Sequence, residues 1–126
     1  AKRQVAIAQA KLAQVEAGAK QGEINAQQAA IDRTQVQLRE EVAAKDAVIA
    51  RLEAEVRNAE LEFQRHDFLE KQGAISASLR DSKRLTLDTA RQQLNEAKAA
   101  RREAAETLAK QVKEAEGTLD RIAEVR

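Results

Sequence analysis

The side chains best suited to chemistry in this sequence are Glu62, His66 and Glu70, which follow one another at four-residue intervals. On a helix this spacing places all three on one face, and carboxylate and imidazole groups are ligands of zinc. Three ligands on one exposed helix seldom hold zinc without a fourth from elsewhere, so we interpret them as a solvated charged face. We therefore expect no metal site and no other cofactor.

The other residue types argue against catalysis. The chain has 126 residues with one His and no Cys or Tyr, which removes most pairs of nucleophile and base. Gly18 and Gly22 follow no strand, and the Lys-Ser or Lys-Thr pair of a phosphate-binding loop is missing. We expect that the chain is not an enzyme.

The composition is typical of long helices and coiled coils. Apolar residues make up 43% of the chain and charged residues 34%, there is no Pro or Trp, and much of the apolar fraction is Ala. The formal net charge of +1 lacks the basic excess of a nucleic-acid-binding protein. No apolar run approaches the roughly 20 residues that span a bilayer. Because the helical pattern is already present at Ala1 and still present at Arg126, we expect a segment of a larger protein.

A turn of the chain is predicted at Gly73. The preceding residues can form the last turn of a helix, and glycine adopts the left-handed conformation that ends a helix at little cost. Ser76 is a good N-cap for a second helix, with Ser78 as another candidate, and Asp81 places a negative charge near that helix's N-terminus. A helix end followed at once by a helix start predicts an antiparallel two-helix hairpin.

Apolar residues on both sides of this turn have the period of a coiled coil. Before the turn they form two interleaved heptad rows, Ile24, Ile31, Leu38 and Leu52 with Val42, Ile49, Val56 and Phe63. After it the corresponding residues are Leu87, Leu94, Leu108 and Ile122 with Ala90, Ala97 and Ala104, joined by Val112 and Leu119. We therefore expect an all-α fold, a long antiparallel two-helix coiled-coil hairpin with arms at 23–71 and 77–126 and a tip at 72–76.

Two charged residues, Lys45 and Arg101, occupy positions in these core rows. We interpret them as long side chains that extend past a thin seam, with Asp46 and Glu103 as compensating neighbours. A polar layer that fixes the register of the two helices is the alternative.

The apolar stripe of the first twenty residues does not continue the seam. Its members are Val5, Ala8, Leu12, Val15 and Ala19. The step of five to Ile24 interrupts the alternation of three and four, and it falls on the segment from Gly18 to Gly22. We expect a break or kink at 18–22 and a separate short helix over 1–17. An unbroken helix is the alternative, because an isolated Gly costs only about 1 kcal/mol.

The most specific pattern surrounds the predicted turn. Arg65, Leu69 and Ser76 form the spacing Arg-x3-Leu-x6-Ser, which encloses Gly73 and Ile75 and is followed five residues later by Asp81. Here the sequence resembles the α-helical hairpin of periplasmic adaptor proteins, also called membrane fusion proteins, of the HlyD-like family. In that family the same Arg, Leu and Ser spacing marks the hairpin tip. The resemblance covers the tip closely and the arms only by pattern. The segment 17–24 is also similar to the entry of the hairpin in adaptors that serve ABC-type exporters.

This resemblance implies a docking function. The tip residues Arg65, Leu69, Gly73, Ile75 and Ser76, supported by Asp81, would bind the periplasmic end of a TolC-type outer-membrane channel. The rest of the protein would reach an inner-membrane transporter of ABC type. Family members assemble as rings or funnels of hairpins, so self-association is implied as well. The expected location is the periplasm, with the full-length protein anchored in the inner membrane, and no nucleic acid is expected as a partner.

Each tip residue also has a structural interpretation, and two other functions stay open. Ser76 would cap the second helix, Leu69 would cover Ile75, and Arg65 would pair with Glu62 or Asp81. A structural coiled-coil spacer needs no active tip. A nucleic-acid-binding helical arm would use the basic cluster of Arg80, Lys83 and Arg84, which is diluted by Asp67, Glu70, Asp81 and Asp88.

Overall fold

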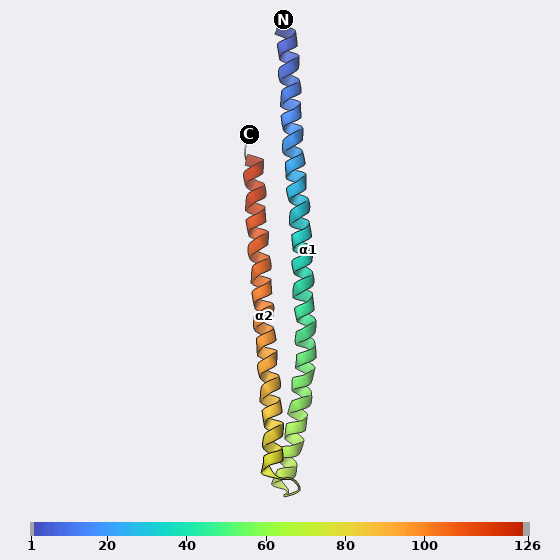
Figure 1. Ribbon diagram of the computed structural model, residues 1–126, viewed down its shortest axis with the longest axis vertical. Helices are drawn as coiled ribbons and strands as arrows, with labels where there is room; N and C mark the ends of the chain where they lie inside the picture. Colours follow the sequence, from blue (N-terminus) through green and yellow to red (C-terminus); the bar gives the residue numbers. More distant parts are fainter. Residues whose placement is uncertain (1, 125–126) are drawn as a thin grey trace. The chain divides into compact units, whose positions relative to one another are not determined.

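The computed structural model describes residues 2–124 and contains two α-helices, α1 (Lys2–Lys71) and α2 (Ala77–Glu124), joined by residues 72–76 (Figure 1). No strand occurs within 2–124. The predicted all-α, two-helix fold is confirmed, and the connecting segment coincides with the predicted tip. Residue 1 of the predicted N-terminal helix lies outside the described residues, as do residues 125–126 of the predicted second arm.

The two helices contribute to two compact units. Ala1–Leu38 and Thr107–Arg126 form one, which we call the terminal unit. Arg39–Glu106 form the other, which we call the tip unit because it contains residues 72–76.

In the tip unit the helices pack along the predicted rows. Leu52 of α1 and Leu87, Ala90 and Ala104 of α2 are buried. The remaining predicted seam positions of this unit are half-buried, namely Val42, Ile49, Val56, Phe63, Leu94 and Ala97. An ion pair joins Glu60 to Arg91 at 3.3 Å and another joins Asp46 to Arg101 at 2.9 Å. Residue numbers fall along α1 as they rise along α2, so the helices are antiparallel (Figure 1).

The second of these pairs accounts for a charged residue in the seam. Arg101 is half-buried, and its Nε donates a hydrogen bond to Asp46 Oδ1. Asp46 is therefore the compensating neighbour predicted for it. Lys45 is also half-buried, as expected for a long side chain at a thin seam. Glu103 is exposed and has no ion pair within the described part of the chain, so its predicted compensating role is wrong.

The terminal unit uses the same rows with less burial. Ile31 is its buried residue among those described. The half-buried seam residues are Ile24, Leu38, Leu108, Val112, Leu119 and Ile122. Lys20 Nζ donates a hydrogen bond to the carbonyl oxygen of Ala123 at 3.1 Å. Every described residue from 2 to 19 is exposed.

The break expected at 18–22 is wrong. α1 continues through Gly18 and Gly22, and residues 2–17 belong to it rather than to a separate short helix. Both glycines have ordinary helical backbone, since the positive φ among the described residues is at Gly73. An isolated Gly costs a helix about 1 kcal/mol. The high helix propensity of the flanking Ala, Gln and Glu residues offsets this cost. The five-residue step from Ala19 to Ile24 does not require a break in the helix. The apolar stripe before it is exposed and therefore does not have to stay in phase with the seam.

Candidate docking site at the hairpin tip

The end of α1 is closed by a Schellman motif centred on Gly73. The N–H of Ala74 donates to the carbonyl oxygen of Leu69 and the N–H of Gly73 donates to that of Glu70, both at 2.9 Å. Gly73 has a φ of 74°, the left-handed conformation that this motif requires. The turn predicted at Gly73 is confirmed, and Leu69 belongs to the backbone bonding that holds it.

The start of α2 is capped by Ser76. Its Oγ accepts a hydrogen bond from the N–H of Leu79 at 3.1 Å, and its carbonyl oxygen accepts one from the N–H of Arg80 at 3.3 Å. Ser76 is thus the N-cap, as predicted, and Ser78 lies inside the helix. The cap uses an oxygen lone pair and leaves the hydroxyl hydrogen free to donate to another molecule.

A side-chain network centred on Arg80 joins the two helix ends. Arg80 Nη1 lies 3.2 Å from Glu70 Oε2, and Arg80 Nη2 lies 3.0 Å from Asp81 Oδ1. Arg80 and Glu70 are both half-buried. The hydrogen bond to Asp81, followed by the negative charges of Asp81, Glu70 and Asp67, raises the pKa of Arg80, while its partial burial acts in the opposite direction. This network could not be found from local sequence signals, because it depends on how the loop closes.

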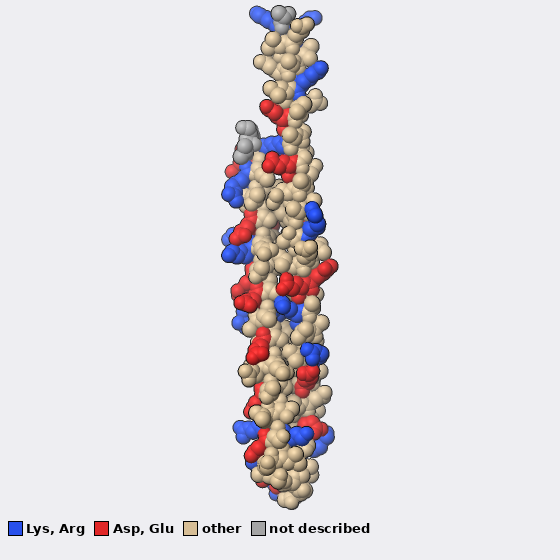
Figure 2. Space-filling model, in the orientation of Figure 1, with Lys and Arg blue, Asp and Glu red and all other residues tan. Residues whose placement is uncertain are grey.

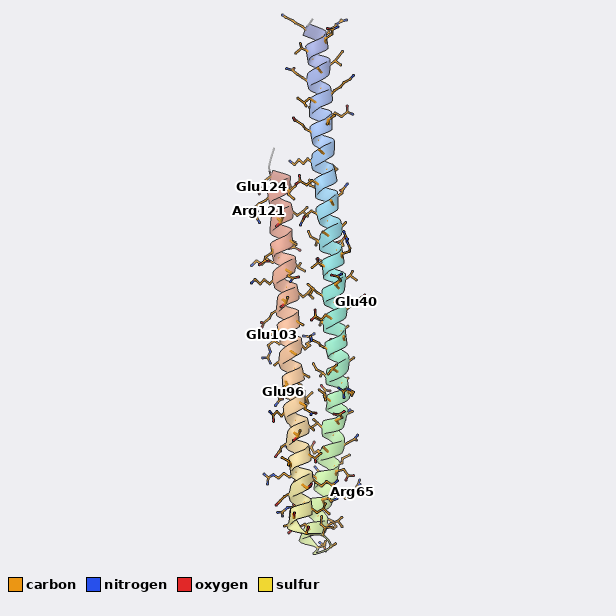
Figure 3. The ribbon with its side chains drawn as sticks, viewed as in Figure 1. Glu40, Arg65, Glu96, Glu103, Arg121 and Glu124 are labelled. Atoms are coloured by element: carbon orange, nitrogen blue, oxygen red, sulfur yellow. The ribbon has the colours of Figure 1, made fainter. Side chains whose placement is uncertain are left out.

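The three motif residues occupy different parts of the tip. Arg65 lies on the side of α1 away from α2 (Figure 3) and its side chain is 66% exposed, with Nη1 3.2 Å from Glu62 Oε1. Leu69 is half-buried, and Ser76 is exposed on the far side of the loop. Of the two partners expected for Arg65, Glu62 is correct and Asp81 is not, since Asp81 binds Arg80.

The remaining predicted tip residues lie close to the loop. Ile75 is half-buried, and Asp81 is exposed in the first turns of α2. The structure therefore brings Leu69, Gly73, Ile75 and Ser76 together around one turn. Arg65 lies about one helical turn before Leu69 along α1.

The trio Glu62, His66 and Glu70 does not assemble a metal site. Glu62 binds Arg65, and Glu70 binds Arg80. The His66 side chain is only 17% exposed, and its Nδ1 lies 2.7 Å from the carbonyl oxygen of Glu62. No cluster of three metal-ligating side chains occurs among residues 2–124. The interpretation as a solvated face fits Glu62, whose side chain is 45% exposed. It is wrong for Glu70, which is half-buried beside Arg80, and for His66, which lies in the seam row of Leu52 and Ala59.

Sequence reasoning missed the exposed apolar side chains near the tip. Phe68 is 61% exposed and Leu79 is 41% exposed. Figure 2 shows that the surface at the tip consists mainly of residues other than Lys, Arg, Asp and Glu. The signal that could have revealed Phe68 is its position, two residues beyond the seam residue His66 and thus on another face of the helix.

Comparison of the chain with protein-family models, with curated proteins and with solved structures finds no match in any of the three. None of the helices in the described part of the chain is long and apolar enough to cross a membrane.

Proposed function

We propose that the chain is the hairpin of a periplasmic adaptor that docks by its tip onto a TolC-type outer-membrane channel. Through the rest of the protein it connects this channel to an inner-membrane exporter of ABC type. The observation that carries the proposal is the Arg65, Leu69 and Ser76 spacing around the turn, with the turn closed at Gly73 and capped at Ser76.

The surface chemistry of the tip supports a docking role. Arg65 offers several hydrogen-bond donors from an exposed position, and Phe68, three residues later on α1, offers apolar surface beside it. Leu79 offers further apolar surface at the start of α2. Arg and aromatic side chains such as Phe are enriched at protein interfaces, and Arg is among the residues that contribute most binding energy there. A single tip of this size buries little surface, so several tips presented together in a ring or funnel would bind far more strongly.

The neutralisation of Arg80 argues against the nucleic-acid alternative. Its guanidinium group is bound by Glu70 and Asp81, so the basic cluster of Arg80, Lys83 and Arg84 loses one of its charges for phosphate binding.

The test uses the full-length adaptor and its channel. Arg65→Ala, Leu69→Ala and Ser76→Ala are each expected to abolish export and to prevent capture of the channel while circular dichroism stays helical. Arg57→Ala is the matched control, since Arg57 is an exposed arginine of α1 two turns before Arg65. Ser76→Asp retains an N-cap and removes the hydroxyl donor, so it separates capping from channel contact.

Unchanged export and channel capture by the Leu69→Ala protein would refute the proposal and favour a structural spacer, which needs no active tip. A salt-dependent gel shift with tRNA would favour the nucleic-acid-binding arm instead.

A further inference from the structure

An aromatic side chain is exposed at the tip, on the same side of α1 as Arg65. The chain has two phenylalanines and no tryptophan or tyrosine. Phe63 is half-buried in the seam, whereas Phe68 is 61% exposed. Phe68 follows Arg65 by three residues, so both side chains lie on the side of α1 away from α2 (Figure 3). The carbonyl oxygen of Phe68 accepts a hydrogen bond from the N–H of Gln72 at 3.1 Å, so the backbone that carries the ring is held in the last helical turn.

The motif residues nearest the loop form the turn itself. Leu69 is half-buried, and its carbonyl oxygen accepts one of the two hydrogen bonds that close the Schellman motif. Gly73 supplies the left-handed conformation of this motif, and the Ser76 hydroxyl caps α2. These three residues determine the shape of the tip. Phe68 is the large apolar side chain that this shape presents beside Arg65.

The charges around Phe68 are matched within the chain. Between residues 62 and 72 every Asp, Glu, Lys and Arg belongs to an ion pair, and the three pairs are Glu62–Arg65, Asp67–Lys71 and Glu70–Arg80. Paired charges of opposite sign produce little net field, so this face does not favour a strongly charged partner. Arg65 donates one N–H to Glu62 and keeps others for neutral acceptors. The face therefore offers a partner an apolar ring beside unused hydrogen-bond donors.

We propose that Phe68 is the main side-chain contact between the tip and the channel. Its ring enters an apolar hollow on the channel, and Arg65 donates hydrogen bonds to uncharged acceptors at the edge of that hollow. Leu69, Gly73 and Ser76 are positioning residues, because they hold the turn that places Phe68. The inference rests on the proposed function, since the partner that covers Phe68 is the proposed channel.

The first test measures the affinity of the full-length adaptor for the purified channel. Phe68→Ala is expected to weaken binding about tenfold, because the ring leaves water on docking. Phe68→Leu should retain most of the affinity, since leucine fills much of the same hollow. Leu61→Ala is the matched control and should bind like the unchanged protein. Leu61 is 57% exposed on the same side of α1, about 10 Å further from the tip along the helix.

Salt dependence tests the uncharged nature of the contact. Raising the salt concentration from about 0.1 M to about 0.5 M should change the affinity of the unchanged adaptor less than about twofold. A steep fall in affinity would overturn the inference, because it would assign the contact to charged groups rather than to Phe68.

Urea denaturation of this chain separates contact from positioning. Phe68→Ala should leave the urea midpoint unchanged, because the ring is mostly exposed. Leu69→Ala removes a half-buried side chain, so it should lower both the urea midpoint and the affinity for the channel. Sedimentation of the Phe68→Ala chain without the channel should match that of the unchanged chain.

Several results would overturn the inference and leave the proposed function standing. Equal affinity of the unchanged and Phe68→Ala adaptors is one, and an equal loss in Leu61→Ala is another. A lower urea midpoint for Phe68→Ala would make Phe68 a structural residue, and altered sedimentation would assign it to contact between copies of this chain. If the unchanged adaptor does not bind the channel, the proposed function fails and this inference fails with it.

Discussion

Gly18 in α1 and Gly73 in the following loop show that glycine has opposite effects in two backbone conformations. Gly73 has a φ of 74°, where a Cβ is sterically disfavoured. Gly18 has helical backbone, and a Cβ added there meets no atom within 4 Å. Glycine is thus required at the turn and is only a cost within the helix.

The same substitution is therefore expected to act in opposite directions at these positions. Gly73→Ala should lower the free energy of unfolding by about 1–2 kcal/mol, because alanine in the left-handed region is strained. Gly18→Ala should increase helicity at little or no cost, with a gain of up to about 1 kcal/mol in helix stability. Urea denaturation and circular dichroism of the two proteins provide the measurement. A neutral Gly73→Ala protein would mean that the loop adopts another conformation in solution.

The candidate site could be predicted where its interactions are local. The helix end at Gly73 and the cap at Ser76 depend on residues within five positions of each other, so sequence reasoning identified both. The pairing of Arg80 with Glu70 spans ten residues and depends on loop closure. It was missed, and Asp81 was expected near Arg65 although it binds Arg80.

At the scale of the elements, the seam could be predicted because heptad spacing is a property of each helix alone. The continuity of α1 through Gly18 and Gly22 is left open by the sequence, because the change of phase there fits both a break and an unbroken helix. The phase matters only where a second helix packs against the stripe, and residues 2–19 are exposed. The exposed apolar side chains off the seam, such as Phe68 and Leu79, were missed for a related reason. Heptad spacing identifies only the residues that pack between the two helices.

The stability of the two helix ends that flank the loop 72–76 is expected to depend on Arg80. Arg80→Glu places a third acidic side chain beside Glu70 and Asp81, so it should lower the urea midpoint and speed amide exchange of Gly73 and Ala74. Glu70→Arg in the same protein should restore part of both losses. The control is Arg84→Glu, at an exposed arginine four residues further along α2, which should change neither. Equal effects of the two single substitutions would assign the loss to net charge rather than to the Arg80 network.

The raised pKa of Arg80 also determines how this network depends on pH. A group whose pKa is raised on folding contributes its stabilisation fully below its ordinary pKa and loses it only as the pH rises through the raised value. Arg80 should therefore add no pH dependence to stability between about pH 6 and pH 9.

At the scale of the whole chain, burial is unevenly divided between the two units. Leu52, Leu87, Ala90 and Ala104 are buried in the tip unit, and Ile31 is the buried residue of the described terminal unit. Local opening free energies follow such differences in apolar contact. The terminal unit should therefore open at a lower free energy than the tip unit.

Hydrogen exchange of the purified chain provides the test. Amides at 49–63 and 87–104 should exchange most slowly, and amides at 2–19 should exchange fastest, at rates close to those of an isolated helix. Comparable protection of 2–19 and 49–63 would show that another molecule covers the N-terminal part of α1 in solution.

The antiparallel seam also implies an order of folding. The contacts between α1 and α2 join residues separated by 10, 31, 55 and 103 positions, in order of increasing distance from the turn along the sequence. Loop-closure entropy makes the last of these about 2 kcal/mol costlier than the first to form alone, so the helices should join at residues 72–76 and zip outward. Leu87→Ala should then slow folding, while Ile31→Ala should mainly accelerate unfolding, and stopped-flow φ-values would measure the difference. The segment proposed to dock would thus be the place where the two helices first meet.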